Sequence, residues 1–242
     1  MENPYRSAAL QILNIVRNTN RTQHVYREVD SSSFNKVSHR FYRNCQKRIE
    51  QLGFQKIADI EDVTLRGLTY TKPTFIRLMG NPDLKINAAI YEVSTDLFMK
   101  ILSFFRRFKL RIYEFSTHFA NDFVIETTIA SPTTQNVKID TIRYQYGGNR
   151  SVEELFNMHK SKHDEIRNKC NLSGYFYADS VDSFTEYNNR LFELKKATCE
   201  KKGWVSKEYL FNQVGKNKKL VKIIYNEIQE ILEEEKIGMV DC

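Results

Sequence analysis

Six segments of strand length follow one another between residues 54 and 146, and this run constrains the fold more than any other feature. Each contains β-branched or aromatic residues, and turn formers such as Gly80-Asn81-Pro82-Asp83 and Asn121-Asp122 separate several of them. The predicted strands are 54–60, 74–79, 85–93, 110–117, 123–129 and 137–146. Because strands joined by short turns pair antiparallel, we expect one antiparallel sheet.

Helical patterns flank this run on both sides. An amphipathic helix is predicted over 5–18, a short strand over 23–29 and a second helix over 34–52, preceded by the N-cap chemistry of Asp30 to Ser33 and ended by Gly53. After residue 150, Ser151 and Glu154 form a capping-box pattern. Helices are predicted there over 151–169, 180–201, 206–213 and 218–236.

These patterns predict an α+β fold. We expect an antiparallel sheet of about five to seven strands packed by the N-terminal helices, with a helical C-terminal segment. The expected parts are an α+β sheet domain over 1–150 and a helical segment over 151–242, packed together as one globular unit. The 242 residues are 41% hydrophobic and 12% aromatic, which is sufficient for a substantial core.

The composition bears on location and partners. The formal net charge is +7, and a basic protein is attracted to nucleic acid or to acidic proteins. The four cysteines are scattered and form no CxxC pair, which is typical of a reducing compartment. With no run of 18 apolar residues and no secretory signal pattern at the N-terminus, we expect a soluble, cytoplasmic protein without a membrane span.

Two groups of basic residues are candidate contacts for an anion or a protein partner. In the predicted helix 34–52, four cations spaced 4, 3 and 4 residues apart line the side opposite its apolar face: Lys36, Arg40, Arg43 and Lys47. Further along, Arg106, Arg107 and Lys109 lie among phenylalanines, a combination that suits single-stranded nucleic acid or an acidic interface. The alternative for both groups is an ordinary solvated face.

A separate set of residues are candidates for catalytic or metal chemistry. Carboxylates on the predicted strands, with one histidine, would need to converge in a pocket to act as acids or bases: Asp59, Glu61, Glu92, Glu114, His118 and Glu126. His159 and His163 are four residues apart on a predicted helix, the spacing of a metal pair. Lys160 stands where a zinc protease has its glutamate, so we expect these histidines to bind no metal. We expect no cofactor elsewhere in the chain.

The last predicted helix has an unusual charge order, since lysines precede it and Glu233, Glu234 and Glu235 lie at its end. Both oppose the helix dipole, and either a bound anion or a neighbouring charged helix would explain them. The segments 206–213 and 218–236, separated by Val214-Gly215, also have a loose helix–turn–helix spacing.

No nucleotide-binding or catalytic motif occurs in the chain. The first hypothesis is therefore a non-catalytic binding protein that uses its basic faces, with an acidic protein or nucleic acid as partner. The alternatives are a small-molecule-binding protein or enzyme with a carboxylate-lined pocket on the sheet, and a nucleic-acid-binding protein. Whether the chain is an enzyme, and its oligomeric state, stay open.

Overall fold

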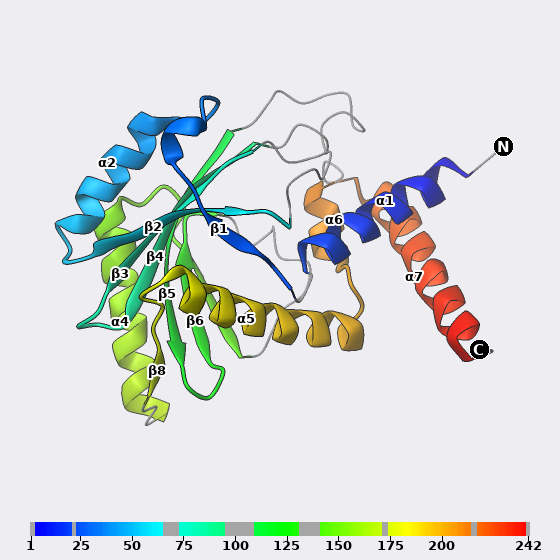
Figure 1. Ribbon diagram of the computed structural model, residues 1–242. Helices are drawn as coiled ribbons and strands as arrows, with labels where there is room; N and C mark the ends of the chain where they lie inside the picture. The colour runs from blue at the N-terminus through cyan, green and yellow to red at the C-terminus, as the bar shows by residue number, and fades with distance from the viewer. Residues whose placement is uncertain are drawn as a thin grey trace. The chain divides into compact units, whose positions relative to one another are not determined.

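A computed structural model describes residues 3–20, 23–64, 73–94, 109–130, 141–170, 174–213 and 217–240 (Figure 1). The chain forms two compact units. The sheet unit contains the described residues from Gln23 to Leu191. The helical unit contains Asn3 to Asn20 and the described residues from Phe192 onward.

The sheet unit is built on one mixed, mainly antiparallel sheet. Seven strands follow one another across it in chain order: β1 (Tyr26–Glu28), β2 (Gln55–Asp62), β3 (Ile76–Asn81), β4 (Ile86–Ser94), β5 (Lys109–Phe119), β6 (Val124–Thr128) and β7 (Ile142–Tyr146). A short eighth strand, β8 (Tyr175–Phe176), pairs with the end of β5. Neighbouring strands are antiparallel except β6 and β7, which are parallel.

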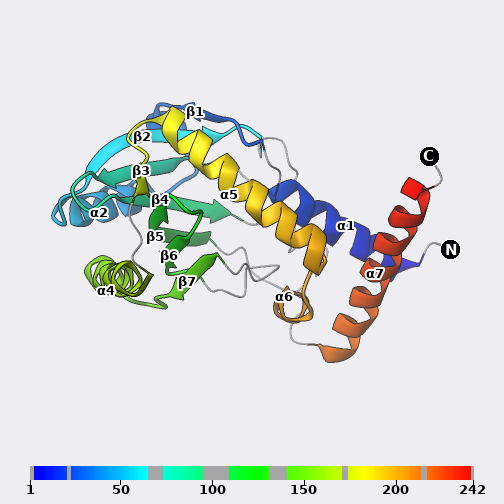
Figure 2. The ribbon, with the colours of Figure 1, turned by 90° about the horizontal axis from the view of Figure 1, so that it is seen from below.

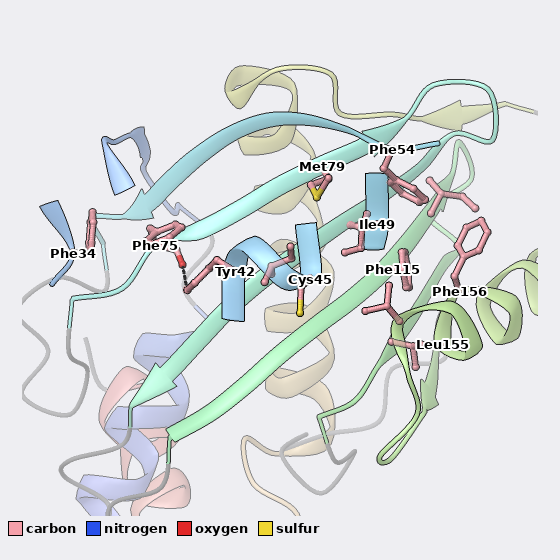
Figure 3. Packing of buried hydrophobic residues seen from close by; sticks show 14 residues of the cluster. Phe34, Tyr42, Cys45, Ile49, Phe54, Phe75, Met79, Phe115, Leu155 and Phe156 are labelled. Atoms are coloured by element: carbon pink, nitrogen blue, oxygen red, sulfur yellow. Dashed lines mark hydrogen bonds between the residues drawn. The ribbon is translucent and has the colours of Figure 1, made fainter. Parts of the chain in front are cut away.

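Two helices cover one face of this sheet, α2 (His39–Glu50) and α4 (Val152–Cys170) (Figure 2). Their apolar sides meet alternate residues of the central strands, including Phe75 and Met79 of the β3 region and Phe115 of β5 (Figure 3). Tyr42 and Ile49 of α2 and Leu155 of α4 are fully buried in this cluster. Burial of these large side chains fixes which face of each strand points toward the helices.

The opposite face is partly covered by the first half of α5 (Val181–Lys202) (Figure 2). Val181 and Phe184 pack there against Ala58 and Ile60 of β2 and Leu78 of β3. Tyr26 of β1 accepts a hydrogen bond from Asn188, which ties the edge strand to the helix. Both faces of the sheet therefore have packed helices.

The helical unit contains α1 (Pro4–Thr19), the part of α5 from Phe192 onward, α6 (Lys207–Gln213) and α7 (Lys218–Val240). α1 packs along α7 with Ala9, Leu13 and Val16 buried. Ion pairs join the two helices, from Arg6 to Glu227 and Glu234 and from Arg17 to Glu235. None of the helices in the described part of the chain is long and apolar enough to cross a lipid bilayer.

The predicted α+β class, with its sheet, N-terminal helices and helical C-terminal segment, is confirmed. The expectation that every strand pair would be antiparallel is wrong for β6 and β7. Thirteen residues separate these two strands, which is long enough for the chain to return to the starting end of β6. The division into 1–150 and 151–242 stays a prediction.

Candidate anion-binding surface

The three candidate carboxylates on the α2 face of the sheet each have a cation beside them. Asp59 accepts two hydrogen bonds from Arg77, at 2.7 Å from Nε and 2.9 Å from Nη2, and one from Lys56 at 2.7 Å. Burial raises the pKa of Asp59, but these hydrogen bonds outweigh burial, so the pKa is lowered overall. The Asp59–Arg77 pair is almost fully buried and joins two neighbouring strands.

Glu61 and Glu92 lie on the same face as Asp59 and have partners of their own. Glu61 lies 3.3 Å from Nη2 of Arg27, and Glu92 lies 3.2 Å from Nε of Arg111. Both glutamate side chains are buried while both arginines are about half exposed. A cation beside a buried carboxylate offsets part of the free-energy cost of removing its charge from water.

Glu114, His118 and Glu126 belong to the opposite face, because strand residues alternate between the faces. Tyr91 donates a hydrogen bond to Glu114 at 3.0 Å, and burial together with this carboxylate raises the pKa of Tyr91 well above its usual range. The ring of His118 packs against Tyr187. The six candidates for acid–base chemistry are thus divided three and three between the two faces, rather than gathered in one pocket.

His159 and His163 both lie on the side of α4 that is buried against the sheet. The two ring nitrogens of His159 lie 2.8 Å from the hydroxyls of Thr117 and Thr127. The Thr127 hydroxyl donates its hydrogen bond to Gln145, so Thr127 accepts a hydrogen bond from Nδ1 of His159. Nε2 of His159 then accepts a hydrogen bond from the Thr117 hydroxyl. Burial, with a smaller effect of nearby His163, lowers the pKa of His159 to about 3.

His163 uses its nitrogens elsewhere, since they lie 3.0 Å from Asp164 and 3.2 Å from the hydroxyl of Tyr175. The two histidines therefore face different partners. Within the described ranges, no group of three or more His, Cys, Asp or Glu residues is placed to hold a metal ion.

The basic face of α2 consists of Arg40, Arg43 and Lys47, which are exposed on the side opposite Tyr42 and Ile49. None of the three forms an ion pair with another residue in the described part of the chain. The other charged residues of the same helix have partners, since Arg48 pairs with Glu153 and Glu50 accepts a hydrogen bond from Gln46. The spacing of 3 and 4 residues keeps the basic face in one row along the helix.

Lys36 does not belong to this row, although its sequence spacing predicted that it would. The side chain of Asp30 accepts from the backbone N–H of Ser32 at 2.9 Å and caps a short 3₁₀ turn over Ser31–Ser33. The chain then leaves helical geometry at Phe34, and α2 begins only at His39. The cap predicted for the long helix thus serves a separate turn, and Lys36 lies between the two.

Lys36 instead lines a pocket of about 400 Å³ in the sheet unit. The walls come from β1 and the residues after it, the 3₁₀ turn and the segment that follows, the end of β2, and the residue at position 73: Arg27, Val29, Ser33, Phe34, Asn35, Lys36, Glu61 and Pro73. Two cations and one buried carboxylate line it, so its formal charge is +1. Arg27 was not among the predicted site residues, because only the β1–β2 register brings it to Glu61.

The second predicted basic group is only partly within the described residues. Lys109 is the first residue of β5 and is paired with Ser94, whereas Arg106 and Arg107 lie outside the described ranges.

Comparison with known proteins adds no relative, since no protein-family model, curated protein sequence or solved structure matches this chain.

Proposed function

We propose that this protein is a binding protein that holds an acidic segment of a partner protein on the basic face of α2. The observation that supports this proposal is that Arg40, Arg43 and Lys47 have no ionic partner among the described residues. By contrast, the three buried carboxylates on the sheet face that α2 covers each have a cation beside them. Like charges three or four residues apart destabilise a helix by about 0.2–0.5 kcal/mol per pair. Carboxylates of a partner would remove this repulsion.

The chemistry of this face favours carboxylates over single-stranded nucleic acid. Arginine guanidinium groups bind carboxylates through two parallel hydrogen bonds, and two of the three cations are arginines. Single-stranded nucleic acid needs exposed aromatic rings for stacking. Of the Phe and Tyr residues of α2, Tyr42 is instead buried in the core and Phe41 is partly buried against it.

The pocket supports a second candidate function, the binding of a small organic acid. Its volume of about 400 Å³ suits a small metabolite, and its net charge favours a monoanion. Lys36→Glu should then abolish the rise in melting temperature that a panel of organic acids produces, whereas Lys85→Glu, at an exposed lysine on the β3–β4 turn, should not. A panel that never shifts the wild-type melting temperature would remove this candidate.

The proposed partner binding is tested by fluorescence anisotropy with a labelled oligoglutamate peptide. R40E/R43E/K47E should weaken binding about tenfold or more, because each reversal replaces an attraction with a repulsion. The matched control is K218E/K219E/K222E, which makes the same change in net charge on α7. Equal losses in both variants would attribute binding to overall charge and contradict the proposal.

A further inference from the structure

The positive charge of the chain is concentrated between the later part of α5 and the first turns of α7. Between Lys195 and Asn226 there are nine lysines and two glutamates, a net charge of +7, equal to that of the whole chain. The next nine residues, from Glu227 to Glu235, contain five glutamates and no cation. α7 is therefore basic in its first turns and acidic in its later turns.

Residues of α1 and its N-cap Asn3 form the partners of several glutamates in the acidic part of α7. Glu227 accepts a hydrogen bond from Asn3 at 2.6 Å, Arg6 pairs with Glu234, and Arg17 binds Glu235 through two hydrogen bonds of 2.6 and 2.9 Å. Of the two explanations for the charge order, a bound anion or a neighbouring charged helix, the second therefore applies to the acidic part of α7. The basic part has no such neighbour, because Lys218, Lys219 and Lys222 are exposed and pair with no carboxylate in the described ranges.

α6 and α7 pack against each other and have the sequence spacing of a helix–turn–helix. Four residues separate them, and the side chain of the last, Asn217, accepts from the backbone N–H groups of Lys219 and Leu220 at 3.1 Å. Tyr209 and Leu210 of α6 are buried, as are Val221 and Ile224 of α7. The two helices contact each other and are inclined to one another in both views (Figures 1 and 2).

We infer that the first turns of α7 form a binding surface for duplex DNA, independent of the basic face of α2. In helix–turn–helix proteins the second helix enters the major groove with its N-terminal residues. A helix about 10–12 Å across fits a groove about 12 Å wide. Lys218, Lys219 and Lys222 would contact phosphates, and exposed Asn226 offers an amide to base edges.

The cost of these lysines to the helix supports a role in binding. Cations in the first turn oppose the helix dipole, and this repulsion is strongest at low salt. Replacing them with glutamate should therefore stabilise α7. A variant that is at least as stable as the wild type but no longer binds DNA separates binding from folding.

The test uses the full chain and a fluorescein-labelled duplex of about 20 base pairs, followed by anisotropy at two salt concentrations. K218E/K219E/K222E should lose about tenfold or more in affinity, while R40E/R43E/K47E, with the same net charge, keeps wild-type affinity. Urea unfolding of both variants checks that they remain folded.

Three results would overturn the inference: no duplex binding by the wild type at low salt, equal losses in the two variants, or equal affinity for a single strand of the same length. The last would show that the groove is not what is recognised. Since the oligoglutamate assay uses a different probe and a different helix, failure here is distinguishable from failure of the proposed function.

Discussion

At the scale of single residues, burial sets the ionisation of His159. Thr117 and Thr127 occupy both ring nitrogens, and burial lowers the pKa to about 3. Unfolding exposes this histidine and returns the pKa to about 6.5, so the unfolded state binds an extra proton between these two values. The stabilisation that neutral His159 contributes is therefore complete above about pH 6.5 and is lost as the pH falls toward 3.

His159→Gln should remove this pH dependence. In the wild type, protonation of this residue in the unfolded state lowers the free energy of unfolding by about 2 kcal/mol between about pH 7 and pH 5. The variant should be less stable at about pH 7 but lose about 2 kcal/mol less than the wild type on acidification. Urea titrations at the two pH values measure the difference; identical pH dependence in both proteins would assign acid sensitivity to other groups.

At the scale of elements, Tyr42 connects α2 to two strands at the point where their ladder ends. Its hydroxyl donates to the carbonyl of Phe75 at 2.8 Å (Figure 3) and accepts from the N–H of Glu92 at 2.9 Å, just beyond the Ile76–Tyr91 pair. All of the Tyr42 side chain is buried, and burial raises its pKa to about 12. One hydroxyl thus satisfies two backbone groups that water cannot reach.

Tyr42→Phe should lower the free energy of unfolding by about 1–3 kcal/mol, because both backbone groups lose a partner inside the protein. The control is Tyr113→Phe, which removes an exposed hydrogen bond to the carbonyl of Arg150 that water can replace. Urea unfolding compares the two. Equal costs would mean that the Tyr42 bridge adds nothing beyond an ordinary surface hydrogen bond.

The elements themselves could be predicted from local sequence. The capping box is present, with Ser151 and Glu154 bonded reciprocally, and Gly53 follows α2 with a φ of +86° that favours glycine. The start of α2 could not be predicted, because Asp30 caps the short 3₁₀ turn over Ser31–Ser33 and not the helix itself. Lys36 was placed on the wrong element for this reason.

Which candidate residues share a face of the sheet could not be predicted, because the pattern within one strand does not contain the register between strands. Alternation places Asp59 and Glu61 on one face of β2, and Glu114 and His118 on one face of β5. It does not say whether those two faces are the same, since that depends on the register between strands. The register puts them on opposite faces and brings Arg27 to Glu61.

At the scale of the whole molecule, the described residues include exposed groups of positive charge on the basic face of α2 in the sheet unit and in the first turns of α7 in the helical unit. Elsewhere in the described residues, many cations are paired, as Arg77 is with Asp59 and Arg17 with Glu235. Because each of the two triple variants lowers the net charge by six, each controls for the effect of the other on long-range electrostatics.

A charge-swap titration tests the central proposal most directly. The wild-type protein should bind labelled oligoglutamate and not oligolysine, whereas R40E/R43E/K47E should bind oligolysine and not oligoglutamate. K218E/K219E/K222E, with the same net charge, should keep the wild-type preference. If R40E/R43E/K47E still binds oligoglutamate as the wild type does, or if both variants change preference together, the basic face of α2 is not the binding surface.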